Sequence, residues 1–316
     1  MSPGAVQVRG LSRSFGSLRA VEALTFDVGE GELFGLVGPD GAGKTTTLRM
    51  LAGVLPPTGG DARVFGHSVA RDPEAMKHEI AYMPQRFGLY TDLTVRENLD
   101  FYADLYGVPG HEREERLERL YRFSGLGPFE ERLAGDLSGG MKQKLGLSCA
   151  LVHDPKLLLL DEPTFGVDPI SRRDLWLVVH EMVARGVTVV VSTAYMDEAE
   201  RFDRVALLHG GRMSALDTPE ALRAGLEGRL LAVRDAPVRR VRDAARDVPG
   251  VAGASIFGDR VHVMTEQGRT AAALEAGLRR ALERAGLGGA RVEAAGPTME
   301  DVFMDRARRA EAARAG

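Results

Sequence analysis

The stretch Gly38-Pro39-Asp40-Gly41-Ala42-Gly43-Lys44-Thr45-Thr46 decides the fold of this chain. It follows an apolar run at residues 33–37 and fits the pattern GxxxxGK[ST]. The glycines let backbone N–H groups turn toward phosphate oxygens, and a helix starting here adds the positive end of its dipole. Lys44 is placed to bridge the β- and γ-phosphates, and the Thr45 hydroxyl to hold Mg²⁺. All nine residues are therefore predicted to form a nucleotide phosphate site.

Short apolar runs around this loop indicate an α/β fold. Each run is followed by a loop and a helical pattern, which is typical of parallel strands covered on both faces. The four runs are residues 33–37, 80–83, 157–160 and 187–192. Residues 1–30 and 62–65 alternate in polarity and predict an antiparallel flank, whereas residues 87–136 have apolar spacing typical of helices. The sequence thus predicts a P-loop NTPase core of mixed sheet with a helical subdomain at about 87–136.

A second, smaller domain is expected after residue 229. A helix start at Thr218-Pro219-Glu220, followed by Gly225 and Gly228, marks the boundary, so the domains are predicted at 1–225 and 229–316. Beyond it, strand and helix patterns follow the order βαββαβ, which predicts a small α+β ferredoxin-like domain. Thr298 and Asp301 form a capping box that begins a final helix. The predicted strands are 229–234, 251–257, 260–265 and 290–295, and the helices are 237–247 and 269–285.

Composition excludes several classes of protein. The 316 residues are 44% hydrophobic and 27% charged, which is typical of a globular chain, and the net charge of −4 argues against a nucleic-acid partner. No run approaches the roughly 18 apolar residues that span a bilayer. The single cysteine gives no disulfide or metal framework. A role at a membrane is therefore expected to depend on another chain.

Two adjacent acidic residues follow the third apolar run. Asp161 and Glu162 would lie at the carboxyl end of a buried strand, where ligands bind in open α/β sheets. Asp161 is predicted to anchor Mg²⁺, and Glu162 to polarise the water that attacks the γ-phosphate. The alternative is an ordinary strand exit with solvated acids. A GTPase of the Ras type is disfavoured because the one asparagine, Asn98, is not in an NKxD pattern.

A second anion site is predicted at Ser138-Gly139-Gly140, where a serine and two glycines precede a helical pattern. This chain has only one phosphate loop, so a second subunit is expected to supply the phosphate for this site. The alternative is a capped helix with no further role.

These motifs together resemble those of ATP-binding-cassette (ABC) ATPases, the nucleotide-binding subunits of transporters, over about residues 5–222. Five motifs occur in the order of that family: residues 38–46 are similar to the Walker A loop, Gln85 in 82–85 to the Q-loop, 137–143 to the signature, 157–162 to Walker B and 166–169 to the D-loop. The resemblance implies ATP and Mg²⁺ as ligands. It also implies a homodimer or heterodimer in which each ATP lies between one Walker A loop and the partner's signature.

The resemblance assigns further roles. Gln85 would contact Mg²⁺ and relay to an integral membrane permease, Phe15 would stack on adenine, and Asp168 would act across the dimer interface. The alternatives are a loop residue for Gln85, a core residue of the flanking sheet for Phe15 and an Asp-Pro turn for Asp168.

Two segments, 82–85 and 297–303, resemble single-cassette subunits of drug exporters that carry a C-terminal accessory domain. That resemblance implies a cytoplasmic chain held at the inner face of the cell membrane by its permease. The accessory domain would reinforce the dimer or sense a ligand.

Three positions depart from the family pattern. Asp40 stands where the family usually has Asn, Met141 where it has Gln, and Ala194 where it has a histidine that contacts the γ-phosphate and the attacking water. Because Glu162 is present, the sequence still predicts an ATPase that drives export, with reduced activity possible. Two alternatives remain: a slow or non-hydrolysing nucleotide switch, and a soluble ABC protein acting outside transport.

Overall fold

The structure, a computed structural model, describes residues 4–315, with side chains to residue 310. It divides into two compact units, with the division between Leu216 and Asp217. Helix α7 (Pro219–Ala224) belongs to the second unit, where it contacts α10 (Met299–Ala315). The boundary predicted from the sequence, at 225–229, lies on the other side of this helix.

A six-stranded sheet forms the centre of the first unit, with strand order β10-β9-β3-β8-β7-β6. The four predicted apolar runs are its neighbouring parallel strands β3, β8, β7 and β6, which confirms the α/β core. The strands are β3 (Leu33–Val37), β6 (Ile80–Met83), β7 (Leu157–Asp161), β8 (Thr188–Thr193), β9 (Arg204–His209) and β10 (Arg212–Asp217). Strands β9 and β10 were not predicted from the sequence.

The register of this sheet brings the carboxyl ends of three strands together. Val37 at the end of β3 pairs with Thr193 at the end of β8, and Ser192 on β8 pairs with Asp161 at the end of β7. Parallel strands end at the same edge of a sheet, so the phosphate loop after β3 and the acidic pair after β7 emerge side by side.

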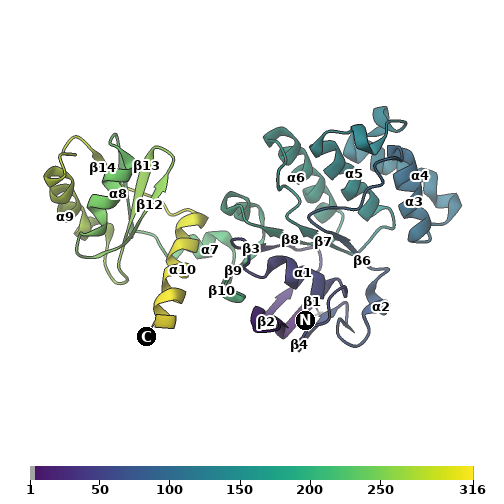
Figure 1. Ribbon diagram of the computed structural model, residues 1–316, viewed down its shortest axis with the longest axis horizontal. Coiled ribbons are helices and arrows are strands. Elements are labelled where there is room, and N and C mark those ends of the chain that lie inside the picture. Colours follow the sequence, from purple (N-terminus) through teal and green to yellow (C-terminus); the bar gives the residue numbers. More distant parts are fainter. Residues whose placement is uncertain (1–3, 316) are drawn as a thin grey trace. The chain divides into compact units, whose positions relative to one another are not determined.

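The predicted antiparallel flank is a second sheet, with strand order β2-β1-β4-β5. Helix α1 (Lys44–Leu51) contacts β7 and β8 of the central sheet and β2 and β4 of the flanking one, so it lies between the two sheets (Figure 1). The rings of Phe26 and Phe34 stack 5.3 Å apart within the core that joins them. The flanking strands are β1 (Val6–Phe15), β2 (Leu18–Val28), β4 (Gly59–Val64) and β5 (His67–Ser68).

Helices α3 (Val95–Leu105) and α4 (Gly110–Ser124) form the predicted helical insertion and pack on α5 (Gly139–Leu151). Thr94 and Glu97 cap α3 reciprocally through side chains and backbone. Cys149 on α5 is fully buried, and this burial raises the pKa of its thiol. The remaining helices of this unit are α2 (Pro73–Met76) and α6 (Pro169–Ala184), with short 3₁₀ turns at Gly127–Phe129, Ala134–Asp136 and Met196–Arg201.

The second unit contains the elements β11-α8-β12-β13-α9-β14, with antiparallel pairs in the order β12-β13-β11-β14. This βαββαβ arrangement has the strand order of a ferredoxin-like domain. Thr298 and Asp301 cap α10 through each other's backbone N–H groups. The elements are β11 (Leu230–Arg234), α8 (Val238–Arg246), β12 (Val251–Phe257), β13 (Arg260–Thr265), α9 (Ala271–Arg284) and β14 (Arg291–Ala294).

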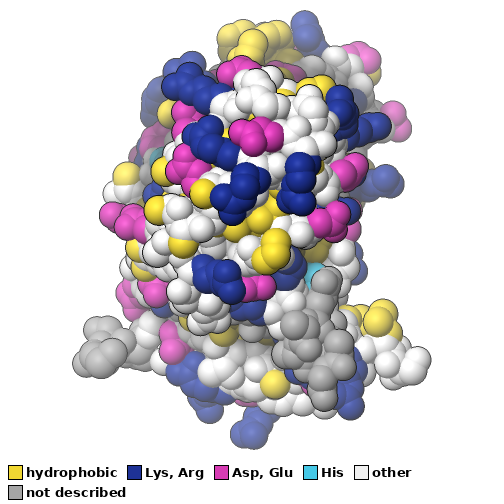
Figure 2. Space-filling view, turned by 90° about the vertical axis from the view of Figure 1, so that its left-hand side faces the viewer, with side chains coloured by type: hydrophobic (Ala, Val, Ile, Leu, Met, Phe, Trp, Pro, Cys, Tyr) yellow, Lys and Arg dark blue, Asp and Glu magenta, His cyan; other side chains and the backbone are white. Residues whose placement is uncertain are grey.

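The surface of the second unit carries charges of both signs. Figure 2 shows basic and acidic side chains interspersed over one face, with apolar side chains between them. Within residues 4–315, no helix combines the length and the apolar character that crossing a bilayer requires.

Candidate active site

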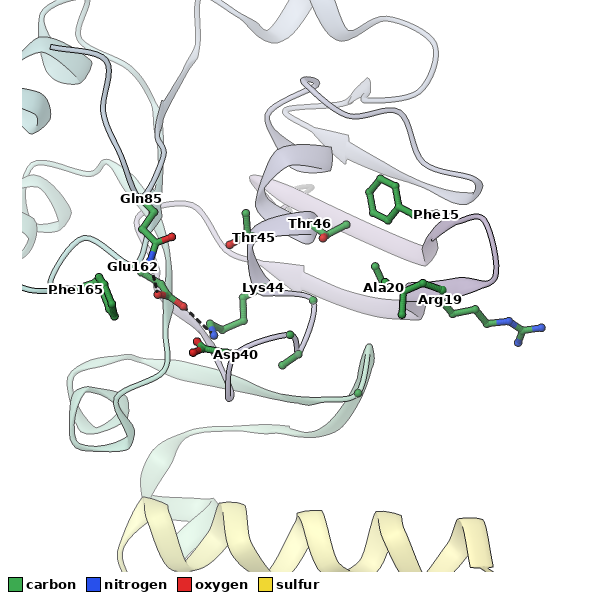
Figure 3. Close-up of a pocket in the computed structure, with 15 residues that line it drawn as sticks. Phe15, Arg19, Ala20, Asp40, Lys44, Thr45, Thr46, Gln85, Glu162 and Phe165 are labelled. Carbon is green, nitrogen blue, oxygen red and sulfur yellow. Dashed lines mark hydrogen bonds and ion pairs between the residues drawn. The ribbon is translucent and has the colours of Figure 1, made fainter. Parts of the chain in front are cut away.

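A cavity of about 610 Å³ opens beside the phosphate loop (Figure 3). Seven of the predicted nucleotide-loop residues line it, together with Phe15, Gln85 and Glu162. Gly38 and Pro39 do not line it but contact Lys44 through their carbonyl groups. The lining residues are Phe15, Leu18, Arg19, Ala20, Asp40, Gly41, Ala42, Gly43, Lys44, Thr45, Thr46, Gln85, Glu162, Phe165 and Gly210.

Glycine at position 43 is required by the shape of the loop. Gly43 precedes α1 with a φ of +100°, a conformation that side chains disfavour, and a Cβ there would lie 2.6 Å from the carbonyl oxygen of Ala20. The backbone can therefore turn tightly into the helix at this point. The turn places Lys44 and Thr45 in the first helical turn, facing the cavity.

Lys44 is buried and its ammonium group is surrounded by acceptors. Its side chain is 4% exposed, and Nζ lies 3.0 Å from Oε1 of Glu162. Nζ also donates to the carbonyl oxygens of Gly38 (2.8 Å) and Pro39 (3.1 Å). A buried charge needs such partners to offset its desolvation. A phosphate group that binds Lys44 must therefore compete with the carboxylate of Glu162.

Glu162 is held in an unusual backbone conformation. Its φ is +48°, which is uncommon for a residue with a side chain. Such backbone conformations cluster at functional sites. Its backbone N–H donates to the hydroxyl (3.0 Å) and carbonyl (3.1 Å) oxygens of Ser192. Gln85 donates through Nε2 to Oε2 of the Glu162 carboxylate at 3.1 Å. Both carboxylate oxygens are thus engaged, one by Lys44 and one by Gln85.

The carboxylate of Asp161 is buried and accepts two short hydrogen bonds at one oxygen. Oδ1 accepts from the hydroxyls of Thr45 (2.9 Å) and Ser192 (2.7 Å), and Asp161 is 1% exposed. Tyr82 donates to Oδ2 at 3.4 Å. Burial, followed by the charge of Asp161, raises the pKa of Tyr82 to about 12, so its hydroxyl stays protonated at neutral pH.

The Thr45 and Asp161 oxygens fit a magnesium ion. Mg²⁺ prefers hard oxygen ligands and is usually held by one or two protein groups together with substrate phosphates and water. No group of three or more His, Cys, Asp or Glu side chains able to hold a metal occurs in the described part of the chain. A magnesium ion here would therefore depend on phosphate oxygens for much of its coordination.

No role for Ser192 or Tyr82 was predicted from the sequence. Ser192 is fully buried and contacts both acidic residues, donating to Asp161 and accepting from Glu162. Polar residues directly after three valines, at the end of the strand, were the only signal in the sequence. The importance of Ser192 depends on the pairing of β7 with β8, which no local pattern reveals.

We expect Ser192→Ala to lower ATP turnover by about tenfold, because a hydrogen bond to a buried charge contributes about 1.5–3 kcal/mol. The Mg²⁺ concentration for half-maximal turnover should rise as well, since Asp161 loses its shortest hydrogen bond. Ser192→Thr, which keeps the hydroxyl, is the matched control. Turnover and Mg²⁺ dependence unchanged in Ser192→Ala would contradict this role.

The predicted signature residues do not reach this cavity. Ser138 accepts a hydrogen bond from the backbone N–H of Met141 (3.3 Å) and so caps α5, while Ser138 and Gly139 are exposed. A Cβ on Gly140 would lie 2.1 Å from Oγ of Ser171 on α6, so a glycine is needed for these helices to pack closely. Within one chain, the signature forms an exposed helix start apart from the phosphate loop.

Asp168 caps helix α6. Its Oδ1 accepts from the backbone N–H groups of Ile170 (3.1 Å) and Ser171 (3.0 Å), and hydrogen bonds from Ser171 lower the pKa of Asp168. The residue is exposed and does not line the cavity. Its predicted role across a dimer interface stays a prediction.

Phe15 lies at the rim of the cavity. It is 45% exposed and lies on the opposite side of the cavity from Glu162 and Gln85 (Figure 3). The guanidinium of Arg13 lies 4.7 Å from the centre of its ring. An accessible ring favours ligand contact over a place in the core, while adenine stacking remains a prediction.

Ala194 follows β8 next to the start of the phosphate loop. The carbonyl of the preceding residue, Thr193, accepts a hydrogen bond from the backbone N–H of Gly38 at 3.2 Å. Ala194 is half-buried, and no histidine lines the cavity within residues 4–310. The position thus lies near the predicted phosphate site but has no side-chain proton donor or acceptor.

Known proteins share this architecture. The family model for ABC transporter matches residues 21–165. The chain is 38% identical over 256 residues to the daunorubicin/doxorubicin resistance ATP-binding protein DrrA of Streptomyces peucetius, covering 81% of this chain and 78% of that protein. This chain belongs to the ABC transporter ATP-binding family.

A second relative extends well beyond this ABC chain. The probable multidrug ABC transporter ATP-binding protein YbhF of Escherichia coli (strain K12) is 46% identical over 274 residues, covering 85% of this chain but 47% of YbhF. The chain therefore spans about half the length of that relative. A solved ATP-binding subunit of an ABC transporter, 34% identical, matches the ABC chain with a TM-score of 0.64 over 70% of this chain and 92% of the subunit.

Proposed function

We propose that this chain binds and hydrolyses ATP with Mg²⁺ to power a separate membrane permease in an export system of the drug-efflux type. The observation that supports this most is the meeting of Lys44, Glu162 and Gln85 beside a glycine-rich loop. The names of DrrA and YbhF, drug resistance and multidrug transport, support the export class.

In this proposal, the residues of the site have distinct roles. Lys44 and the loop N–H groups bind the phosphates, and Thr45, Asp161 and Gln85 hold Mg²⁺, which would offset charge on the phosphate oxygens. Glu162 accepts a proton from the attacking water. Its Oε1 must first leave the ammonium group of Lys44, which lies 3.0 Å away, before that oxygen can accept a hydrogen bond from the attacking water. Phosphate binding at Lys44 therefore prepares the base.

We also propose that two chains assemble head to tail, as a homodimer or heterodimer. Exposed Ser138 and Gly139 at the start of α5 present N–H groups that could receive an anion from a partner. Each ATP would then lie between the Walker A loop of one chain and the signature of the other. Asp168 would approach that interface, and the permease would hold the assembly at the inner face of the cell membrane.

Mixing two inactive variants tests this arrangement. We expect Lys44→Ala to lose nucleotide binding and Ser138→Arg to lose turnover while keeping nucleotide binding. A mixed dimer would contain one intact site, with Lys44 from one chain and Ser138 from the other, so mixing should restore part of the activity. Thr270→Arg is the matched control, because it also replaces an exposed helix N-cap residue but does not line the nucleotide cavity.

Two outcomes would decide against parts of the proposal. Ser138→Arg with full turnover would show that the signature does not complete the site. If the two inactive variants, mixed at dimer-forming concentrations, gave no activity, head-to-tail complementation would be contradicted.

A nucleotide switch that does not hydrolyse ATP is the second candidate, and Ala194 is the observation that favours it. Under this alternative, the wild-type chain would bind Mg²⁺-ATP without releasing phosphate, and Glu162→Gln would change nothing in phosphate release. Measuring phosphate release by wild-type protein separates the two candidates.

A further inference from the structure

A second cavity lies entirely within the second unit, between α7, the residue before β11, and α10. Its volume is about 170 Å³, which is far smaller than the nucleotide cavity. Three arginines and one carboxylate contribute to its wall, together with apolar side chains from both helices. The lining residues are Leu222, Gly225, Leu226, Arg229, Gln267, Val302, Asp305, Arg306 and Arg309.

Positive charge exceeds negative charge in this cavity. Asp305 is shared, since Oδ1 lies 3.4 Å from Nη2 of Arg229 and Oδ2 lies 2.7 Å from Nη2 of Arg309. Arg306 has no hydrogen bond or ion pair with another residue in the described part of the chain. One carboxylate therefore serves two guanidinium groups, and the third has no counter-ion among the side chains of residues 4–310.

Arg229 has a buried donor left over. Its side chain is 13% exposed, and its Nη2 donates to the carbonyl oxygen of Thr265 at 2.8 Å. Its Nε is inaccessible and has no hydrogen-bond partner among the described residues. The charge of Arg229 is therefore only partly compensated within the described part of the chain, because leaving a buried, charged donor unsatisfied is costly.

The side chains that line this cavity determine which kind of ligand can bind there. Guanidinium groups bind phosphate oxygens through paired N–H donors, and several arginines around one cavity favour an oxyanion of more than one charge. Leu222, Leu226 and Val302 add an apolar side that suits a small carbon group. The volume is too small for a second whole nucleotide, since the cavity beside the phosphate loop is more than three times larger.

We propose that this cavity binds a phosphate-type oxyanion carried by a small organic group. The source is either a free phosphate monoester or phosphatidic acid, a phospholipid whose headgroup is a phosphate monoester, because both present the same group with more than one negative charge. Neither the geometry nor the charge of this cavity depends on the function proposed for the nucleotide site.

Binding measurements on the full chain test this proposal. The nucleotide site is first saturated with the Mg²⁺ complex of a non-hydrolysable ATP analogue, so that the probe cannot bind there. Glycerol 3-phosphate is then titrated calorimetrically at constant ionic strength, and in a second arm the chain is sedimented with phosphatidylcholine vesicles that contain phosphatidic acid or with vesicles of phosphatidylcholine alone. Arg306→Ala should weaken binding by about tenfold or more in the arm that responds.

Arg280→Ala, which removes an exposed arginine on α9 outside the cavity, is the matched control and should bind as the wild type does. Arg306→Ala is preferred to a change at Arg229, whose hydrogen bond to Thr265 supports the fold. A response to glycerol 3-phosphate assigns the site to free phosphate esters, and a response to phosphatidic acid alone assigns it to lipid headgroups. No binding in either arm, or equal losses in Arg306→Ala and Arg280→Ala, would overturn the proposal.

Discussion

Glu162→Gln is expected to lower steady-state ATP turnover by about 10²- to 10⁴-fold, the usual contribution of a general base. Glutamine is nearly the same size and can still accept from Gln85, but it cannot take a proton from water. Nucleotide binding should persist and become somewhat tighter, because Lys44 no longer has a carboxylate 3.0 Å away that competes with phosphate. Turnover is followed by phosphate release and binding by a fluorescent ATP analogue.

The matched control for this variant is Glu181→Gln, which removes a carboxylate from the exposed surface of α6. It should leave both turnover and binding unchanged. If Glu162→Gln retained the wild-type rate, Glu162 would not be the base. If it lost binding instead, its main contribution would be to the structure of the site.

Ala194→His is expected to raise turnover, by as much as about 10²-fold, the lower end of what one preorganised transition-state contact contributes. Residue 194 directly follows Thr193, whose carbonyl group is hydrogen-bonded to the first residue of the phosphate loop. An imidazole at this position would supply a polar group where the chain now has a methyl group. Phosphate release under saturating Mg²⁺-ATP measures the gain.

Ala194→Leu distinguishes the effect of a polar side chain from the effect of side-chain volume, because leucine adds volume without a hydrogen-bond donor or acceptor. Turnover should rise with histidine and not with leucine. An equal or lower rate in Ala194→His would show that the site has been rebuilt around alanine, in which case the wild-type rate already reflects a different arrangement of the phosphate site.

The sequence predicted the parts of the site that depend on local backbone geometry. Lys44 and Thr45 follow a glycine that the turn requires, and their place beside β3 was evident from a short motif and an apolar run. The position of Glu162 followed from the four leucines before it, which form a buried strand. Such features depend on residues that are close in the chain, so one sequence is enough to predict them.

Features that depend on strand order were not predicted. The hydrogen bonds of Ser192 to Asp161 and Glu162 join residues about thirty positions apart, and they exist because β8 lies next to β7. The arginine cavity likewise combines Arg229 with α10, far along the chain. Strand β9 was missed although its centre is apolar, because no motif marked the residues around it.

The burial of Cys149 has a practical consequence for experiments on this ABC chain. The chain has a single cysteine, which is fully enclosed and whose thiol resists ionisation, so it should react poorly with maleimides and other thiol reagents. For site-specific labelling with thiol reagents, the chain should therefore behave as if it had no cysteine. Pairs of spectroscopic probes on introduced surface cysteines, one in each unit, could measure the distance between the two labels with and without nucleotide.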